Sequence, residues 1–381
     1  MKQYLSLLQN IIDNGVEKES GRDYMPKVLG ISHAVIQMNL KDGFPLLTTK
    51  KMPWKLIVHE LLWFLRGETN IKYLVDNNVH IWDKDAYRWY LKYCTDNKIS
   101  TYFPKIENFV TFIRDTFISI YYDSMNNIHY ELKDSNNELN EHLTALASAN
   151  YIIGDLGKVY GYQWRNQNGV DQIKDLIDGL KNNPYGRRNI IDTWNKSDFH
   201  EMALPPCHLL YQFIVRPLTS YEREDIYFNS YKKEDIYFDY DDEGHFPNAS
   251  DTEVHNTLDE WGAPKFYLDV NMYQRSGDSF LGVPFNIASM SLLLMIISKT
   301  CNMVPGIATW IGGDTHLYIG HIPMAKEQLK RECRKLPQML IKSNTNSLED
   351  IVKLTINDFE LTQYDNPHPS IKAELFTGLK K

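Results

Sequence analysis

The 381-residue chain contains few cysteines, and they are scattered. Its four cysteines form no Cys-x-x-Cys pair: Cys94, Cys207, Cys301 and Cys333. We therefore expect neither a zinc site nor a disulfide framework and assign no metal ligands, and this usage fits a reducing cytoplasm. An excess of positive charge is also missing, because the formal net charge is −8. That balance argues against nucleic acid as a general partner, but it leaves room for a local basic site that binds a small anion.

Targeting and membrane signals are missing as well. The first residues, Met-Lys-Gln-Tyr, have no signal-peptide pattern. The most apolar run, around residues 291–297, is too short to span a bilayer. These absences predict a cytoplasmic protein with no membrane partner.

The order of apolar patterns predicts an α+β fold. Helical or buried-helical patterns lie near 3–15, 54–66, 170–181, 287–300 and 322–332, and β-type patterns near 34–40, 189–194, 209–215 and 266–273. They are mixed without regular βαβ alternation, which disfavours a doubly wound sheet.

Two stretches differ in character from the rest. Residues from about 91 to 150 are rich in Tyr, Asn, Asp and Lys, with an amphipathic part near 109–121 that suggests partial helix. Residues from about 217 to 262 are acidic and contain a short repeat, at 224–228 and 234–238, typical of an acidic surface hairpin or excursion. We interpret 1–381 as a single domain with these two insertions.

One short stretch is the best candidate for chemistry. Residues 202–208 are Met-Ala-Leu-Pro-Pro-Cys-His. The two prolines fix φ and remove two backbone donors, so the approach to the Cys207 sulfur is stiff. A catalytic thiol also needs nearby positive charge, which Arg187, Arg188 or Arg275 could supply. By itself a Cys-His pair is a weak signal, because a free cysteine is more often a small buried hydrophobe. Glu60, inside an apolar run, is similarly either a paired structural carboxylate or a functional one.

Further runs occur in a fixed order: FPLLTTK, HELLWFL, IWD, GDLGKVYGYQWR, RR, MALPPCH, QRSGDSFLGVPFNIAS and GGDTHLY. Together they resemble the thymidylate synthase family over essentially the whole chain outside the two insertions. The resemblance implies a large mixed sheet with surrounding helices, packed against its twin in a homodimer. It also implies dUMP as the substrate and 5,10-methylenetetrahydrofolate as the one-carbon donor.

The resemblance assigns roles to individual residues. Cys207 is implied as the nucleophile that adds to carbon 6 of uracil and so activates carbon 5, while Glu60, Tyr160 and His208 handle protons. The implied substrate ligands are Arg22, Arg187, Arg188, Gln274, Arg275, Ser276, Asn286, His316 and Tyr318. Of these, Arg187 and Arg188 come from the other subunit. The implied folate contacts are Lys50, Trp82, Asp278, Gly282 and Phe285.

Three departures from the family pattern bear on the product. Arg22 is followed by Asp-Tyr-Met-Pro-Lys rather than a Thr-Gly-Thr-Gly loop, and Asp85 stands where many synthases have Trp or Asn. The chain also continues past Pro-His-Pro-Ser-Ile-Lys with the polar tail 374–381. A synthase must exclude water from the reactive methylene carbon. We therefore favour a dUMP hydroxymethylase, of the kind associated with viral DNA modification, with Asp85 holding the attacking water. The alternatives are a thymidylate synthase and, more remotely, a non-catalytic RNA-binding regulator.

Overall fold

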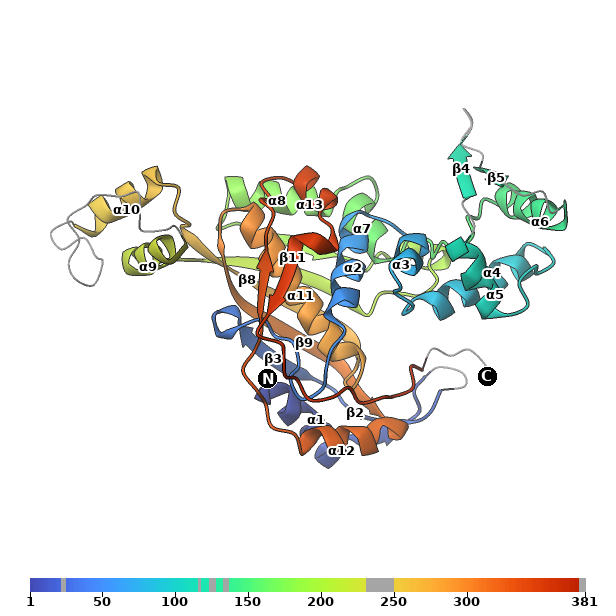
Figure 1. Cartoon of the computed structure of the whole chain (residues 1–381), viewed down its shortest axis with the longest axis horizontal. Coiled ribbons are helices and arrows are strands. Elements are labelled where there is room, and N and C mark those ends of the chain that lie inside the picture. The colour runs from blue at the N-terminus through green and yellow to red at the C-terminus, as the bar shows by residue number, and fades with distance from the viewer. Residues whose placement is uncertain (22–24, 116–117, 123–127, 133–136, 231–249, 377–381) are drawn as a thin grey trace.

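The computed structural model describes residues 1–21, 25–115, 118–122, 128–132, 137–230 and 250–376. Its centre is one seven-stranded sheet (Figure 1). The strands are β1 (Val16–Lys18), β2 (Val28–Ile31), β3 (Ala34–Asn39), β6 (Ile190–Asp192), β7 (His208–Pro217), β8 (Phe266–Asp278) and β9 (Val304–Tyr318).

The sheet is mixed, which confirms the predicted α+β class. Its order is β1-β2-β9-β8-β7-β6, with β3 also paired to β9. The long strands β8 and β9 run parallel, and the other pairs are antiparallel. A parallel pair needs a crossover connection, and here the crossover is the helix α11 (Gly282–Thr300).

One face of the sheet carries the core. The core on this face is formed by the helices α11, α1 (Lys2–Asn14) and α2 (Trp54–Leu65). The helix α11 packs on both β8 and β9. The helix α11 is longer than the predicted 287–300. Among the described residues it is the one helix long and apolar enough to cross a membrane, contrary to the expectation that this run is too short, yet 67% of its apolar window is buried inside the protein. It serves as a core helix here.

The other face of the sheet leaves apolar side chains exposed. Val35 of β3 and Tyr273 of β8 both pair with Ile311 of β9, so the three side chains share a face. Val35 is 61% exposed and Tyr273 is 40% exposed. Ile214 of β7 lies on the same face, four residues beyond Leu210, the partner of Tyr273, and is 41% exposed. An exposed apolar surface of this kind marks a candidate interface.

The remaining elements surround this core. They are α3 (Lys72–Asp76), α7 (Tyr160–Asn166), α8 (Gln172–Asn182), α12 (Ile322–Leu329), α13 (Leu348–Lys353), β10 (Gln338–Ile341), β11 (Phe359–Thr362), η1 (Leu40–Asp42), η2 (Lys196–Glu201), η3 (Ile319–His321) and η4 (Ile356–Asp358).

The first stretch predicted as an insertion, about 91–150, begins inside α4 (Asp83–Asp96). It contains α5 (Ile106–Asp115), β4 (Ile118–Tyr122), β5 (Ile128–Leu132) and α6 (Asn137–Ser148). The helix expected near 109–121 ends at Asp115, and β4 and β5 then form an antiparallel pair. Phe103, Phe109 and Leu146 belong to the main core, so this segment is packed onto the body of the protein.

The second stretch, predicted to be an acidic surface hairpin or excursion, is helical where the structure describes it, which fits the excursion. It contains α9 (Ser220–Ser230) and α10 (Asp251–Glu260), which extend away from the sheet (Figure 1). Ser250 and Glu253 form a reciprocal capping box that starts α10. A small separate cluster holds the pair together: Tyr227, Val254, Leu258 and Ala263. The first repeat copy lies on α9, and residues 234–238 lie outside the described residues. The division into one domain with two insertions stays a prediction.

Candidate active site

Cys207 is held from two sides, just before β7. Its backbone N–H donates to the Tyr160 hydroxyl at 2.7 Å, and its carbonyl accepts from the Arg275 backbone N–H at 2.8 Å. Tyr160 is positioned by the segment before α7, which bridges to the approach to the cysteine through Gly157 and Met202. Gly157 has φ +73°, and a Cβ there would lie 1.9 Å from the Glu201 carbonyl oxygen, so only glycine allows this approach.

Arg275 brings positive charge to the thiol. Its Nη2 lies 4.0 Å from Cys207 Sγ. The guanidinium is fixed because Nε donates to the Pro206 carbonyl at 2.7 Å and Nη2 donates to the Pro205 carbonyl at 2.9 Å. It also lies 5.4 Å from the centre of the Trp194 ring. The thiol is half-buried, so the fixed cation lies beside a sulfur that remains accessible.

Two of the other cysteines are unsuited to nucleophilic chemistry. Cys94 and Cys301 are buried. Burial raises the pKa of the Cys94 thiol and raises that of Cys301 to about 12. Both remain protonated thiols near neutral pH, and a protonated thiol is a poor nucleophile.

Glu60 lies in a polar and aromatic group that includes Trp82 and Tyr160. It comes from the middle of α2, and its Oε1 accepts a hydrogen bond from Trp82 Nε1 at 2.8 Å. Burial raises the pKa of Glu60 to about 7, and the Trp82 hydrogen bond opposes that rise. The Trp82 and Tyr160 rings lie edge to face at 5.9 Å. A carboxyl group titrating near neutral pH can both give and take a proton.

His208 is neutral in this setting. Burial lowers the pKa of its imidazole to about 3, so it cannot supply the positive charge for the neighbouring thiol. Its ring lies 4.4 Å from that of Tyr160, and its Nδ1 is 2.8 Å from the Tyr211 hydroxyl. Sequence reasoning missed Tyr211, because residues three apart on a regular strand point to opposite faces. The register of β7 shifts between His208 and Leu210, which removes that regularity.

The predicted nucleotide ligands of β8, β9 and α11 come together at one end of the parallel pair. Gln274 Nε2 donates to Asn286 Oδ1 at 3.1 Å, and Gln274 Oε1 accepts from Trp310 Nε1 at 2.8 Å. Because the indole can only donate, it fixes the orientation of the Gln274 amide and thereby that of Asn286. Two of the predicted residues, Asp278 and His316, are direct register partners across the two strands.

Two more predicted ligands adjoin this end of the sheet. Ser276 pairs in register with Asp314. The ring of Tyr318 lies 5.4 Å from that of His316.

The predicted folate contacts surround the same end of the sheet. Phe285 and Gly282 lie at the start of α11. The Asp278 carboxylate accepts from the backbone N–H groups of Phe280 at 3.0 Å and Leu281 at 3.3 Å. Lys50 is buried, and its ammonium donates to the Phe280 carbonyl. Burial lowers the pKa of Lys50 to about 8, and the Asp278 charge opposes that. The side chain of Lys50 therefore points inward.

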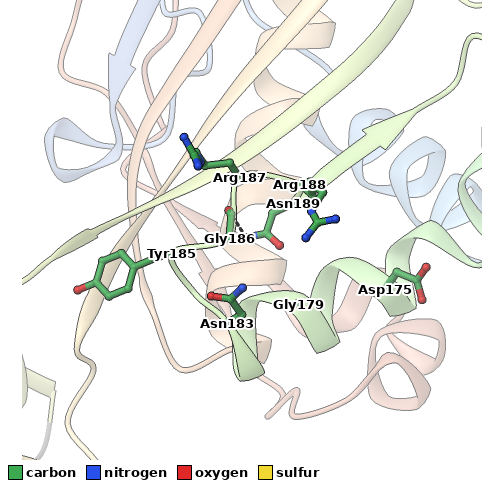
Figure 2. Close-up of a pocket in the computed structure, with 8 residues that line it drawn as sticks. All are labelled: Asp175, Gly179, Asn183, Tyr185, Gly186, Arg187, Arg188 and Asn189. Carbon is green, nitrogen blue, oxygen red and sulfur yellow. Dashed lines mark hydrogen bonds between the residues drawn. The ribbon is translucent and has the colours of Figure 1, made fainter.

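The two arginines that the resemblance assigns to the other subunit's site lie away from Cys207, on the loop before β6. Arg187 and Arg188 are exposed on the loop between α8 and β6. They line a cavity of about 670 Å³ with other residues of that loop and of α8. Figure 2 shows their guanidinium groups pointing apart. Among the described residues neither guanidinium has an ion-pair partner. Arg22 lies outside the described residues.

Two of the three departures that favoured water addition, Asp85 and the C-terminal tail, can be located in the structure. Asp85 is paired with Arg88 at 2.5 Å, and its side chain is only 14% exposed, so its charge is balanced from within α4. The tail after Lys372 also makes an apolar contact. Phe376 packs against Tyr318 with ring centres 4.8 Å apart. The residues after it lie outside the described chain.

A family model described as thymidylate synthase matches residues 2–235 and 249–377. The chain belongs to the thymidylate synthase family. It is 36% identical over 375 residues to "Thymidylate synthase" of Malacoplasma penetrans, covering 98% of this chain and 99% of that protein. It is 35% identical over 375 residues to the protein of the same name from Mycoplasma pneumoniae, with 98% and 99% covered. It is also 35% identical over 371 residues to "Thymidylate synthase" of Mycoplasma genitalium, covering 97% of this chain and 98% of that protein.

Membership of the thymidylate synthase family makes the chain one of a group of one-carbon transferases that act on dUMP with methylenetetrahydrofolate. The three relatives are bacterial and carry the name of the synthase, so they support the alternative rather than the favoured hydroxymethylase, and a viral origin gains no support. Since both chains of each pair are covered almost completely, these relatives have nearly the same length. The two unusual stretches therefore do not distinguish this chain from named synthases.

Proposed function

We propose that this protein is a thymidylate synthase, which converts dUMP and 5,10-methylenetetrahydrofolate to dTMP and dihydrofolate. The observation that carries the proposal is Cys207, a half-buried thiol fixed by Tyr160 on its amide and by Arg275 beside its sulfur. Folate supplies the carbon unit and the hydride. The hydroxymethylase that the sequence favoured is no longer the preferred activity, because the similar full-length relatives carry the name thymidylate synthase. The Asp85 carboxylate, one of the three departures that favoured it, is ion-paired with Arg88.

The roles of the chain's own residues follow from their positions. The Cys207 thiolate adds to carbon 6 of uracil, and the bond is broken again when the product leaves. Asn286, oriented through Gln274, reads the uracil edge. Glu60, with Tyr160 and His208 behind the thiol, carries protons to and from the base. Arg275 and Ser276 hold the phosphate, and His316 and Tyr318 hold the ribose hydroxyls.

The folate donor fits the group of residues beside Asp278. The Asp278 carboxylate is anchored by two backbone N–H groups and remains half-buried rather than sealed off. It would accept hydrogen bonds from the pterin, while Phe285 and Trp82 offer aromatic surface. Lys50 and Gly282 complete the proposed contacts. We also infer a cytoplasmic location, which the family and the core position of α11 support.

The product decides between synthase and hydroxymethylase. We expect dTMP and dihydrofolate to form in a one-to-one ratio when the purified protein receives dUMP and methylenetetrahydrofolate. Mass spectrometry of the nucleotide, with dihydrofolate followed in the same reaction, measures both. Formation of 5-hydroxymethyl-dUMP with tetrahydrofolate would restore the hydroxymethylase, and absence of any turnover would favour a non-catalytic role.

We further propose a homodimer whose subunits share sites. The exposed face with Val35, Ile214 and Tyr273 offers an apolar surface for a second copy. Arg187 and Arg188 are exposed, and among the described residues neither guanidinium has an ion-pair partner. Side chains that bind in the site of a neighbouring subunit would have this appearance when one subunit is viewed alone. In a two-fold dimer each subunit would donate this pair to the other.

Mixing two inactive variants tests the sharing of sites. Cys207→Ala and Arg188→Ala subunits, mixed equally and allowed to exchange, should recover about a quarter of wild-type activity, because half of the dimers are mixed and each has one intact site. Native mass spectrometry verifies the exchange. Mixed dimers without activity would show that Arg188 serves its own subunit, and a monomeric protein would rule out sharing.

A further inference from the structure

The Asp314 carboxylate is held from two sides, near the end of β9 that carries the proposed ribose ligands. Its Oδ1 lies 3.3 Å from His316 Nδ1, and its Oδ2 accepts a hydrogen bond from Lys18 Nζ of β1 at 2.7 Å. The hydrogen bond with His316 lowers the pKa of Asp314 to about 2, helped by Lys18 and opposed by burial. The side chain is therefore a carboxylate near neutral pH, and a carboxylate can only accept hydrogen bonds.

The position of the hydrogen on the His316 ring follows from these contacts. Nδ1 faces two acceptors, the carboxylate and the backbone carbonyl of Asp314, each at 3.3 Å. Nδ1 must therefore carry a hydrogen, and in a neutral imidazole Nε2 is then an acceptor. No hydrogen bond from the described residues reaches Nε2. The backbone of His316 is fixed as well, because its carbonyl accepts from the Ser279 N–H at 2.7 Å.

Lys18 reaches Asp314 because the strand between them has a glycine on the path. The strand β2 lies between β1 and β9, and its Gly30 is the register partner of His316. A Cβ on Gly30 would lie 2.8 Å from Lys18 Cε and 3.2 Å from Lys18 Nζ. Any other residue at position 30 would therefore push the ammonium away from the carboxylate.

We propose that Asp314, held by Lys18, is a positioning residue that keeps the hydrogen of His316 on Nδ1 and so leaves Nε2 to accept from a ribose hydroxyl. The inference rests on the proposed function, which makes His316 a ribose ligand. Asp314 and Lys18 contact no reacting atom. The arrangement selects nucleotides whose sugar hydroxyl can donate to His316, because a nucleotide without that hydroxyl leaves Nε2 unpaired.

Equilibrium binding of two nucleotides tests this role without any turnover. Wild type should bind 2′,3′-dideoxy-UMP at least about tenfold more weakly than dUMP, since the analogue has no hydroxyl to donate. Asp314→Ala should weaken binding of dUMP about tenfold and change binding of the analogue less than about twofold, because the analogue never used the acceptor. A loss of general structure would weaken both nucleotides equally.

Variants at Lys18 and Gly30 test what holds the carboxylate. Lys18→Met and Gly30→Ala should each weaken dUMP binding by about two- to threefold, less than Asp314→Ala, because an exposed ion pair contributes little by itself. Lys72→Met is the matched control. It breaks a Lys72–Asp76 pair whose side chains are 40% and 42% exposed, against 43% and 45% for Lys18 and Asp314. The control should bind both nucleotides as wild type does.

NMR of protein labelled with ¹⁵N-histidine observes the ring hydrogen directly. At pH 8 the His316 signals, identified by their loss in His316→Phe, should show hydrogen on Nδ1 in wild type and a mixture of both tautomers in Asp314→Ala. Asp314→Asn, which keeps an acceptor oxygen, should retain most of the Nδ1–H form. Hydrogen on Nε2 or on both nitrogens in wild type, or equal weakening of dUMP and its analogue in Asp314→Ala, would overturn the proposal. A Lys18→Met protein that binds dUMP as the control does would overturn the part of Lys18.

These measurements remain decisive if the proposed activity fails. If wild type makes no dTMP, nucleotide binding and the tautomer still test Asp314. If wild type binds no dUMP, the proposed function and the ribose role of His316 both fall, while the tautomer in the free protein still shows whether Asp314 positions the ring. If Asp314→Ala fails to fold, Asp314→Asn and Lys18→Met supply the comparison.

Discussion

Replacing Cys207 with alanine should abolish turnover while leaving dUMP binding nearly intact. The thiol is the proposed covalent nucleophile, and removing such a group lowers kcat by on the order of 10⁴-fold or more. In the proposed site other side chains hold the phosphate, ribose and base. The Kd for dUMP should therefore change less than about threefold, since uniform binding does not depend on the nucleophile. Turnover and equilibrium binding of dUMP on the same preparation measure both.

Cys333→Ala provides the matched control. Cys333 is also a free, half-buried cysteine, but it has no place in the site, so its removal should leave the rate unchanged. If Cys207→Ala keeps a rate within about tenfold of wild type, addition of this sulfur to carbon 6 is not the route.

Replacing Glu60 with glutamine should have opposite effects on activity and on stability. The loss of a proton carrier should lower kcat by about 10²–10⁴-fold. The wild-type rate should change with pH around 7, because burial raises the pKa of Glu60 to about 7. The variant should lose that inflection, which a merely structural role would not remove. A pH–rate profile of both proteins is the measurement.

The stability effect arises from the same pKa. The folded-state pKa is raised above the unfolded value, so the folded state holds the proton more tightly. The contribution of Glu60 protonation to the free energy of unfolding is therefore fully present below a pH of about 4.3. It is lost as the pH rises through about 7. Glutamine stays neutral. Glu60→Gln should therefore match wild type near pH 4.5 and exceed its free energy of unfolding at pH 8 by up to about 3 kcal/mol.

Urea unfolding at the two pH values checks the stability effect, with the exposed Glu260→Gln as control. A variant less stable than wild type at pH 8 would mean that the Glu60 carboxylate is stabilised by partners beyond Trp82.

The contiguous parts of the site could be predicted from the sequence. The stiff approach to Cys207 is encoded by adjacent prolines, and the resemblance identified Arg275, which the structure places 4.0 Å from the thiol. The α+β class and most helix positions could be predicted from apolar periodicity. These features depend on neighbouring residues, which a sequence displays directly.

The features that could not be predicted depend on irregular backbone or on distant contacts. Tyr211 reaches His208 only because β7 shifts register. His208 is neutral because it is buried, and its burial could not be predicted from the Cys-His dipeptide alone. The ion pair of Asp85 could not be predicted because its partner Arg88 becomes a neighbour only on the helix α4.

The strand β9 was not assigned in advance because two glycines, at 312 and 313, interrupt its pattern. A Cβ on Gly312 would lie 2.3 Å from Thr315 Oγ1, and one on Gly313 would lie 2.8 Å from the Tyr273 hydroxyl. These glycines allow close approach of neighbouring groups rather than a break in the strand. The need for glycine at position 313 can be recognised only once the neighbouring strand β8, which carries Tyr273, is located.

The parallel pairing of β8 and β9 restricts where this chain can change in length. Asp278 and His316 are register partners, so a proposed folate ligand and a proposed nucleotide ligand share one ladder. Inserting or deleting a single residue in β9 ahead of His316 would shift the rest of the strand by about 3.3 Å and turn each side chain to the opposite face. His316 and Tyr318 would then leave the site together. Changes of length should therefore be tolerated after α4 and after β7 but not within the paired strands β8 and β9, where losing one residue would displace ligands of both proposed binding sites.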